Sequence, residues 1–328
     1  MPQQGSADHL LYDRLLTNVI YEKGMGTPGI AQNLAPRVKS TNITGQYMRR
    51  ERGTKAAGVN TKRAPGAMVQ TGERPGKELK TFKTVDHALS ELIPQEITSG
   101  MEETELMGER RATAMSVLRK ILHDWEKEVF DAIWAEDKAG FEAKYPDTSV
   151  IDPLAKWDAS SGVNMKRDIL RLRLQIYKAC GYIPNTLLIP NEVFNVIITE
   201  DNELRDAIKY TQGGPVTLEK LAAYFEISNV LVPMYLKDNP SGDNEQPMDL
   251  LWQGDHVGLF YIDDTPSRNK DTLATTFYWD SPEQPFLGTF TGYNRKRKSE
   301  EVEVGAYFDV ATIDMSCGGI IADVLNEY

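Results

Sequence analysis

The chain has 328 residues, 41% of them hydrophobic and 26% charged, which is the composition of a folded protein with a sizeable core. No apolar run reaches the roughly 18 residues that a membrane helix needs, so no membrane partner is expected, and the first residues lack a signal-peptide pattern. Because Cys180 and Cys317 are the only cysteines, we expect free thiols in a reducing compartment.

The net charge of −11 is unevenly spread along the chain. Residues 1–98 carry 14 Lys and Arg against 9 Asp and Glu, a net of +5, whereas the remaining residues carry 23 against 39, a net of −16. The basic excess is concentrated in residues 37–83, which hold 12 basic and 3 acidic side chains. A basic segment on an acidic body can bind nucleic acid, and it can equally dock on acidic copies of its own kind.

The N-terminal third is predicted to contain a short helix followed by a long loop. Residues 8–22 have helical amphipathic spacing, with Leu11, Leu15 and Val19 on one stripe that we expect to dock on another surface. Residues 45–76 hold eight Gly or Pro among basic side chains, and large apolar residues are scarce there. Such a stretch cannot bury its own core, so we expect residues 41–83 to be ordered only by neighbouring molecules. Residues 79–94 are interpreted as the return from this loop.

A long helix is predicted from about residue 102 to residue 137. Its apolar face is formed by Ala114, Leu118, Ile121, Leu122, Trp125, Val129 and Ile133. At 1.5 Å per residue it would span about 50 Å, which suggests a structural spine. Gly108 is expected to weaken its first turns.

The segment from residue 156 to residue 198 is the most informative part of the chain. Met165, Ile169, Leu172, Ile176 and Cys180 recur on one helical face, with Asn164 or Ser161 as a cap and Gly181 at the end. A turn at Pro184 and Asn185 then leads into a buried strand over 186–189, and Pro190 opens a helix over 191–198. Further helices are predicted at 203–210 and at 218–225, the second capped by Thr217. Strands are predicted at 229–232, 249–252, 256–262, 273–279, 301–313 and 318–325.

From end to end, the sequence resembles the major capsid protein of tailed bacteriophages of the Hong Kong 97 type. The resemblance rests on the order of all segments, on the unit "GYIPNTLLIP", and on the late segments "LLWQGDHVGLFYI", "TLATTFYWD" and "EEVEVGAYFDVATID". The resemblance implies an α+β fold with an N-terminal arm, an extended E-loop, a long spine helix, and peripheral and axial domains. It assigns residues 1–40 to the arm and 41–83 to the E-loop. Residues 84–151 would form the peripheral domain with its spine helix, 152–250 most of the axial domain, and 251–328 the strands returning to both.

The resemblance also implies a function and its partners. The chain would self-assemble into hexamers and pentamers of an icosahedral shell in the virion, which encloses double-stranded DNA after assembly in the host cytoplasm. A separate scaffolding protein and a portal protein would be partners, with a decoration protein as a further candidate. Contacts between subunits would be made by Leu11, Leu15 and Val19 of the arm and by the basic residues of the E-loop: Arg49, Arg50, Arg52, Lys55, Lys62, Arg63, Arg74 and Lys77. We expect inter-subunit charge pairing to make this loop matter for assembly.

Two alternatives to a virus shell stay open. An encapsulin-type nanocompartment shares the fold and would carry protein cargo instead of DNA. A nucleic-acid-binding protein would use the basic loop, although the loop has few aromatic side chains for base stacking and no recognised nucleic-acid motif accompanies it.

Catalytic and metal-binding patterns are absent from the sequence. His9, His87, His123 and His256 lie far apart, the cysteines lack metal-ligand spacing, and no nucleophile elbow, phosphate loop or dinucleotide fingerprint occurs. The sequence therefore predicts no enzyme activity, no cofactor and no metal.

Overall fold

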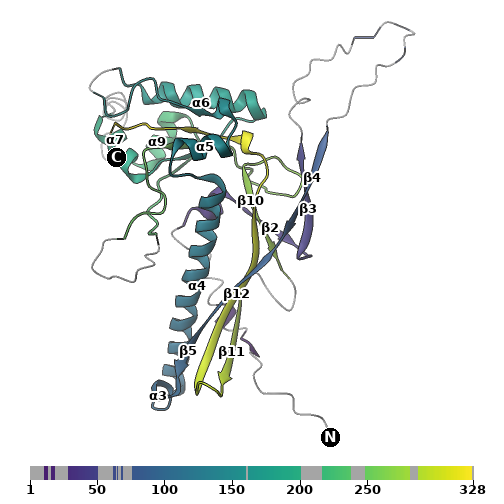
Figure 1. The fold of residues 1–328 in the computed structure, drawn as a ribbon, viewed down its shortest axis with the longest axis vertical. Helices are drawn as coiled ribbons and strands as arrows, with labels where there is room; N and C mark the ends of the chain where they lie inside the picture. The colour runs from purple at the N-terminus through teal and green to yellow at the C-terminus, as the bar shows by residue number, and fades with distance from the viewer. Residues whose placement is uncertain are drawn as a thin grey trace.

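The computed structural model describes residues 11–13, 16–18, 29–50, 62–63, 65, 68, 76–159, 162–200, 216–237, 248–280 and 287–326. A long helix stands beside a long twisted sheet, a second α/β unit sits at one end of both, and a two-stranded hairpin projects from the side (Figure 1). No helix among these residues is long and apolar enough to cross a membrane.

The predicted spine helix is confirmed as α4, Glu103–Ile133, which follows the short helix α3, Gln95–Thr98. Its 31 residues correspond to about 46 Å. The side chain of Glu102 caps the third backbone N–H, and Glu105 caps that of Glu102, so the helix starts firmly despite Gly108. The helix ends four residues before the predicted end, because Trp134 is already extended.

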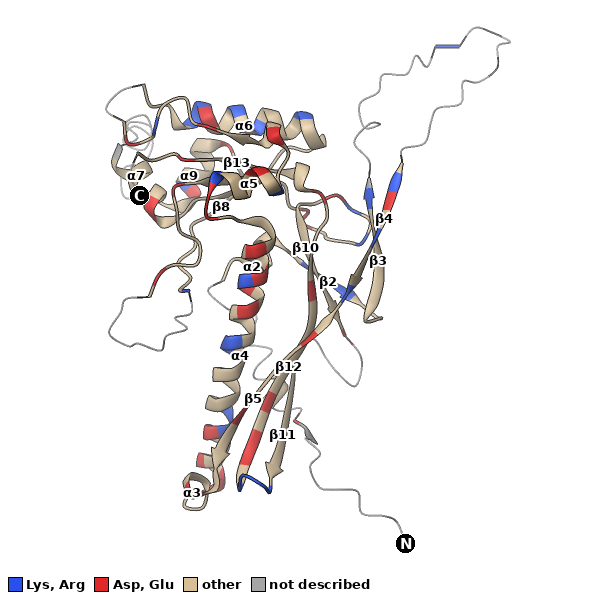
Figure 2. Ribbon diagram, viewed as in Figure 1, with Lys and Arg blue, Asp and Glu red and all other residues tan. Residues whose placement is uncertain are grey.

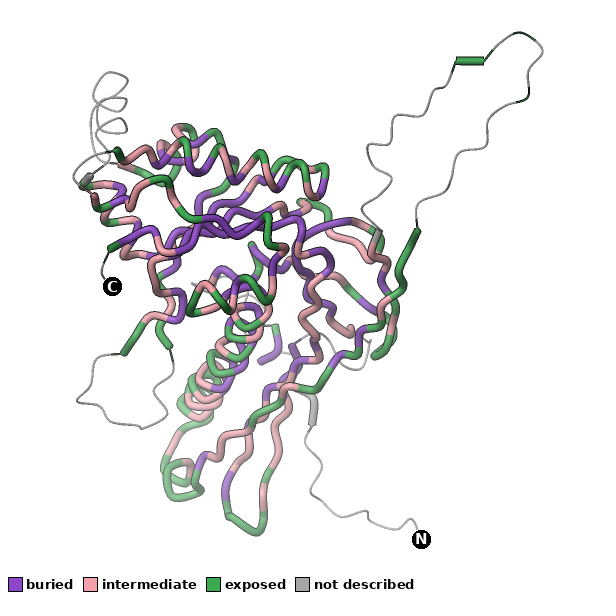
Figure 3. Tube along the Cα trace, turned by 45° about the horizontal axis from the view of Figure 1, so that its top comes forward, coloured by how far each residue is buried: buried purple, intermediate pink, exposed green. Residues whose placement is uncertain are grey.

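A six-stranded sheet packs one face against α4. Five strands follow in the order β1 (Leu11–Tyr12), β11 (Gly288–Asn294), β12 (Ser299–Thr312), β10 (Ala274–Trp279) and β2 (Arg37–Ser40). The sixth strand, β5 (Val85–Pro94), also pairs with β12, along the edge opposite β11. Alternate residues of β12, such as Val302, Val304 and Phe308, are buried in the same core as the apolar stripe of α4. Figure 3 shows this buried seam between helix and sheet.

The sequence predicted a helix over residues 8–22, and this prediction is wrong for the first residues that the structure describes. Leu11 and Tyr12 form strand β1, which pairs antiparallel with Thr291 and Phe290 of β11. Helical residues appear only at 16–18, where Leu16 is buried in the main core. The pairing partner lies nearly 280 residues away, so no local pattern could have revealed it.

The head of the molecule is built around a five-stranded sheet ordered β6 (Val150–Ile151), β13 (Gly318–Ile321), β9 (Val257–Phe260), β7 (Thr186–Leu188) and β8 (Asn229–Leu231). Helices α5 (Lys138–Lys144), α6 (Met165–Cys180), α7 (Asn191–Glu200) and α9 (Leu218–Phe225) surround it. The predicted caps are confirmed: Asn164 accepts from the N–H of Arg167, Thr217 from that of Lys220, and Gly181 is left-handed. The predicted apolar face of α6 lies in a second core.

Other sequence predictions differ from the structure. Residues 249–252 form no strand, only a bridge between Leu236 and Leu250, and strand β11 was not anticipated. The helix predicted at 203–210 lies outside the described residues. The short helix α2 (Ala31–Leu34) ahead of β2 was not anticipated either. The division of the chain into arm, loop, peripheral and axial domains stays a prediction.

Candidate functional site

The hairpin of β3 (Thr44–Arg50) and β4 (Lys77–Lys83) is the projecting element of the molecule (Figure 1). Its root is fixed by a small aromatic cluster: Phe82 stacks on Phe277 of β10 with ring centroids 4.1 Å apart, and Tyr47 stacks on the same ring at 5.6 Å. Ile313 completes this cluster, which is separate from the two larger cores.

Polar contacts add to this root. The N–H of Met48 donates to the carbonyl of Arg268, and the N–H of Lys83 donates to the Asp309 carboxylate at 3.1 Å. The Arg268 guanidinium lies 5.5 Å from the centroid of the Phe82 ring. The prediction that residues 41–83 gain order only from neighbours is therefore wrong for 44–50 and 77–83, which pair with each other and pack on the chain's own sheet.

The structure brings only part of the predicted basic set together. The Arg49 guanidinium lies 3.8 Å from the Glu78 carboxylate on the opposite strand and 3.6 Å from the Asp314 carboxylate. It therefore already forms ion pairs within its own subunit. The Cα atoms of Arg50 and Lys77 are register partners, and Lys77 is exposed. Lys62 and Arg63 are also exposed. Arg52, Lys55 and Arg74 lie outside the described residues, as do Leu15 and Val19 of the arm. The role of all these residues in subunit contact stays a prediction.

An acidic surface lies on the face of the sheet that points away from α4. Alternation along β5 and β12 places Asp86, Glu301 and Glu303 on this face, opposite the buried side chains of Val302 and Val304. Burial, and then the neighbouring charges of Asp86 and Glu301, raise the pKa of Glu303. Figure 2 shows the contrast between acidic residues along β12 and basic residues on the hairpin. We call Asp86, Glu301 and Glu303 the acidic face.

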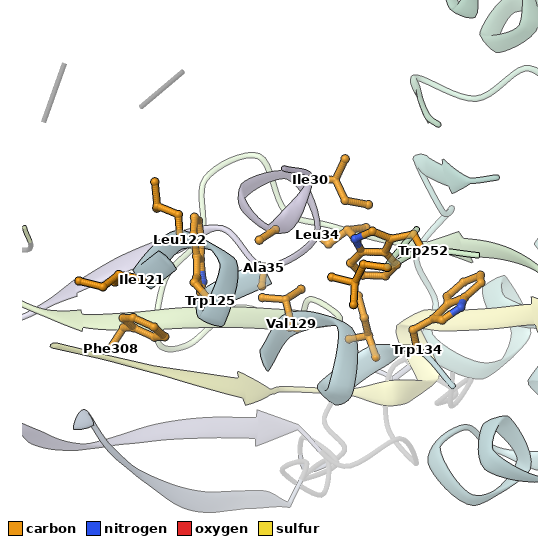
Figure 4. Close-up of a cluster of buried hydrophobic side chains, with 14 of the residues drawn as sticks. Ile30, Leu34, Ala35, Ile121, Leu122, Trp125, Val129, Trp134, Trp252 and Phe308 are labelled. Carbon is orange, nitrogen blue, oxygen red and sulfur yellow. The ribbon is translucent and has the colours of Figure 1, made fainter. Parts of the chain in front are cut away.

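The segment after the arm is held to the spine by a buried carboxylate. Glu126 of α4 is 2% exposed and accepts hydrogen bonds from the N–H groups of Ile30 (3.1 Å) and Ala31 (2.9 Å) and from the indole of Trp252 (2.8 Å). Burial raises the pKa of Glu126, while these hydrogen bonds lower it. Ile30 and Leu34 pack near Val129 and Trp252 in the same region (Figure 4).

One group of potential metal ligands occurs in the described part of the chain, at Asp255, His256 and Asp323. Both ring nitrogens of His256 are already used: Nδ1 accepts from the N–H of Asp323 at 3.0 Å, and Nε2 donates to the carbonyl of Glu136 at 3.3 Å. A metal ion would have to displace a backbone partner of the ring. His256 thus joins the end of β13 to the segment before α5. The two cysteines, Cys180 and Cys317, are both buried.

The sequence predicted a basic loop over residues 41–83, but not its hairpin, the acidic face or the Glu126 contacts. Glu301 and Glu303 alternate with valines in "EEVEVGAYFDV", which is a signal for an acidic strand face. Their closeness to Asp86 depends on the pairing of β5 with β12, which no local pattern predicts. Glu126 lies within the helical pattern beside the apolar stripe, and nothing in the sequence indicates its distant partners.

No protein-family model and no curated protein matches the sequence. The structure is similar to a phage-related protein from Bordetella bronchiseptica RB50, with 19% identity and a TM-score of 0.71 over 97% of this chain and 99% of that chain. A protein described as a prophage capsid protein of E. coli CFT073 is similar at 12% identity and a TM-score of 0.56, over 96% and 99% of the two chains. The SrpI encapsulin of Synechococcus elongatus PCC 7942 is similar at 10% identity and a TM-score of 0.51, over 100% and 95%. At these identities the similarity establishes the fold.

Proposed function

We propose that this chain, which has the Hong Kong 97-type fold of phage capsid proteins, is the major capsid protein of a tailed bacteriophage. Copies assemble into hexamers and pentamers, and these close into an icosahedral shell around double-stranded DNA. The observation that carries this proposal is the end-to-end match of the fold: the similarity to the phage-related protein covers 97% of this chain and 99% of that chain.

The distribution of charge supports contact between copies. Residues 37–83 carry 12 basic against 3 acidic side chains, and the acidic face lies on the body. A hairpin that projects from its own subunit can reach the acidic face of another copy, where the opposite charges attract. Since a heterologous contact of this kind uses different surfaces on the two partners, it propagates from copy to copy.

A nanocompartment for protein cargo is the second candidate function, because the SrpI encapsulin is also among the similar structures. The contents of the shell separate the two candidates. A capsid would be made with a scaffolding protein, filled with DNA through a portal protein and open to decoration proteins, whereas a nanocompartment would retain a protein. We propose further that the subunit has no enzymatic activity of its own.

The test is to express the chain alone and with the adjacent genes of its source, and to image the products by negative-stain electron microscopy. The proposal predicts closed shells larger than any single ring, together with nuclease-protected DNA when the packaging proteins are present. A monomer or small oligomer at every concentration, with a scaffolding protein supplied, would refute it. Shells that hold no DNA when the packaging proteins are present, and that retain one protein other than the scaffolding protein, would support the nanocompartment.

A further inference from the structure

Strand β5 has one edge that no other strand covers in the described part of the chain. All ten of its residues pair with β12, in the unbroken register from Val85 with Phe308 to Pro94 with Ser299. The N–H groups of Lys83 and Gln95, just outside its ends, both point toward the β12 side, to Asp309 and Lys298. Since backbone groups of successive residues alternate between the two edges, the even-numbered residues from 86 to 92 direct theirs away from β12. Within the described residues these groups have no backbone partner.

This edge lacks most of the features that prevent strand pairing, although Asp86 and Glu91 give the strand acidic side chains. Natural edge strands are short, bulged, or carry Lys or Pro along the edge. Strand β5 is ten residues long, has no bulge and no lysine, and its single proline is its last residue, Pro94. Helix α4 packs against β5, and Val85 and Leu89 are still 55% and 40% exposed. A long edge without a bulge, with exposed apolar and acidic side chains, is a site for the addition of a basic strand.

Among the described strands, β4 is the best match for this edge. The N–H of Thr84 donates to Ile43, so the even-numbered residues of β4 face β3 and the odd-numbered ones face outward. Lys77, Leu79 and Thr81 therefore present an open edge, and Leu79 is 61% exposed. Strand β4 carries three lysines, whereas the surface beside β5 carries the acidic face. The other strands that end a sheet are less suitable: β1, β2, β6 and β8 have only two to four residues, and the outer edge of β3 is met by the carbonyl of Arg268 at Met48.

We propose that β4 of one copy pairs through its open edge with the open edge of β5 in a second copy, and so extends the sheet of that copy. This inference rests on the proposed function, because it names the backbone contact between subunits of the shell. Main-chain hydrogen bonds would supply affinity. In an antiparallel pairing the odd-numbered residues of β4 oppose the even-numbered residues of β5, so Lys77 would lie over the acidic face and supply specificity.

Proline substitutions test the pairing without breaking the subunit's own ladders. Ala88→Pro removes an N–H that faces the open edge of β5, and edge positions of this kind tolerate proline. Leu79→Pro does the same on β4. The matched controls, Ala88→Thr and Leu79→Val, keep the N–H. We expect both proline variants to retain the circular dichroism of the parent protein and to lower the yield of shells at least tenfold, while both controls assemble like the parent.

A folded Ala88→Pro or Leu79→Pro protein that assembles at the parent yield overturns this inference, and it does so while leaving the proposed function standing. Failure of the parent protein to form shells instead counts against the proposed function.

Disulfide crosslinking tests the pairing of β4 with β5 even if a proline variant does not fold. Cys180 and Cys317 are buried, so introduced cysteines report contacts cleanly. We expect Ala88→Cys, combined in turn with Lys77→Cys, Leu79→Cys or Thr81→Cys, to give intermolecular disulfides in shells for at least one pair. The absence of crosslinks in all three overturns the pairing of β4 with β5.

Discussion

The most informative single residue is Glu126, a carboxylate that is buried without a cationic partner among its hydrogen bonds. Three donors from distant parts of the chain meet it: the N–H groups of Ile30 and Ala31, and the indole of Trp252. Charge-assisted hydrogen bonds of this kind offset the desolvation of a carboxylate. Gly29 lies so close that an added Cβ would be 2.3 Å from Glu126 Oε2, which explains a glycine before α2.

Replacement of Glu126 by alanine should destabilise the subunit strongly. The variant leaves three donors without an acceptor in a buried site, so we expect a loss of about 2–4 kcal/mol in the free energy of unfolding, and a smaller loss for Glu126→Gln. Urea denaturation followed by tryptophan fluorescence measures both. Lys127→Ala, at an exposed position on the same helix, is the control. If Glu126→Ala is no less stable than this control, the carboxylate does not hold the segment.

Glu128, two residues along the same helix, gives a prediction about pH. Burial first, and then the charges of Asp309, Asp124 and Asp131, raise its pKa to about 7. Because the pKa of Glu128 is higher in the folded than in the unfolded state, protonation of Glu128 favours the folded state. This contribution to the free energy of unfolding is fully present below about pH 4.5 and is lost as the pH rises through about 7.

Glu128→Gln should therefore raise the free energy of unfolding at pH 8 and have little effect at pH 5. The side chain is 39% exposed, so solvent screening reduces the expected gain to about 1 kcal/mol. Thermal denaturation of both proteins at the two pH values measures it, with Glu142→Gln on α5 as an exposed control. An equal effect at both pH values would contradict the assignment.

At the scale of elements, the sequence predicted those whose pattern is local and missed those that depend on distant pairing. Helix α6 has its cap, apolar face and terminal glycine in one stretch, and it was predicted correctly from Met165 to Cys180. Strand β1 was mistaken for a helix, because Leu11, Leu15 and Val19 have helical spacing while the strand's partner is β11. The hairpin was missed because its glycines and basic residues resemble a disordered loop, and its root is fixed by Phe277, nearly 200 residues away.

The root of the hairpin predicts the effect of changing Phe82. This side chain is 2% exposed and stacked on Phe277, so Phe82→Ala should cost about 3 kcal/mol of local stability. Since the cluster is separate from the two main cores, we expect the cores to stay folded while the hairpin becomes sensitive to protease. Limited proteolysis with mass spectrometry should detect new cleavage between residues 76 and 84. Leu79→Ala, exposed on the same strand, is the control. Unchanged protection in Phe82→Ala would show that the cluster does not anchor the hairpin.

At the scale of the whole molecule, the separation of charge has a consequence for assembly. Glu301→Lys with Glu303→Lys would set positive charge against the basic hairpin of another copy, although single exposed pairs are worth only about 0–1 kcal/mol. The effect repeats at every contact, so we expect few or malformed shells from normally folded subunits. Glu96→Lys with Glu142→Lys makes the same change in net charge at exposed positions elsewhere and serves as the control. Equal loss of shells in both variants would attribute the effect to net charge.

The measurement that tests the central claim most directly is a cryo-electron microscopy reconstruction of the particles formed by the parent protein. The account predicts five-fold and six-fold rings of subunits, with the β3–β4 hairpin of each subunit lying across the β5–β12 region of another. A reconstruction in which the hairpin contacts only its own subunit, or particles without such rings, would contradict it.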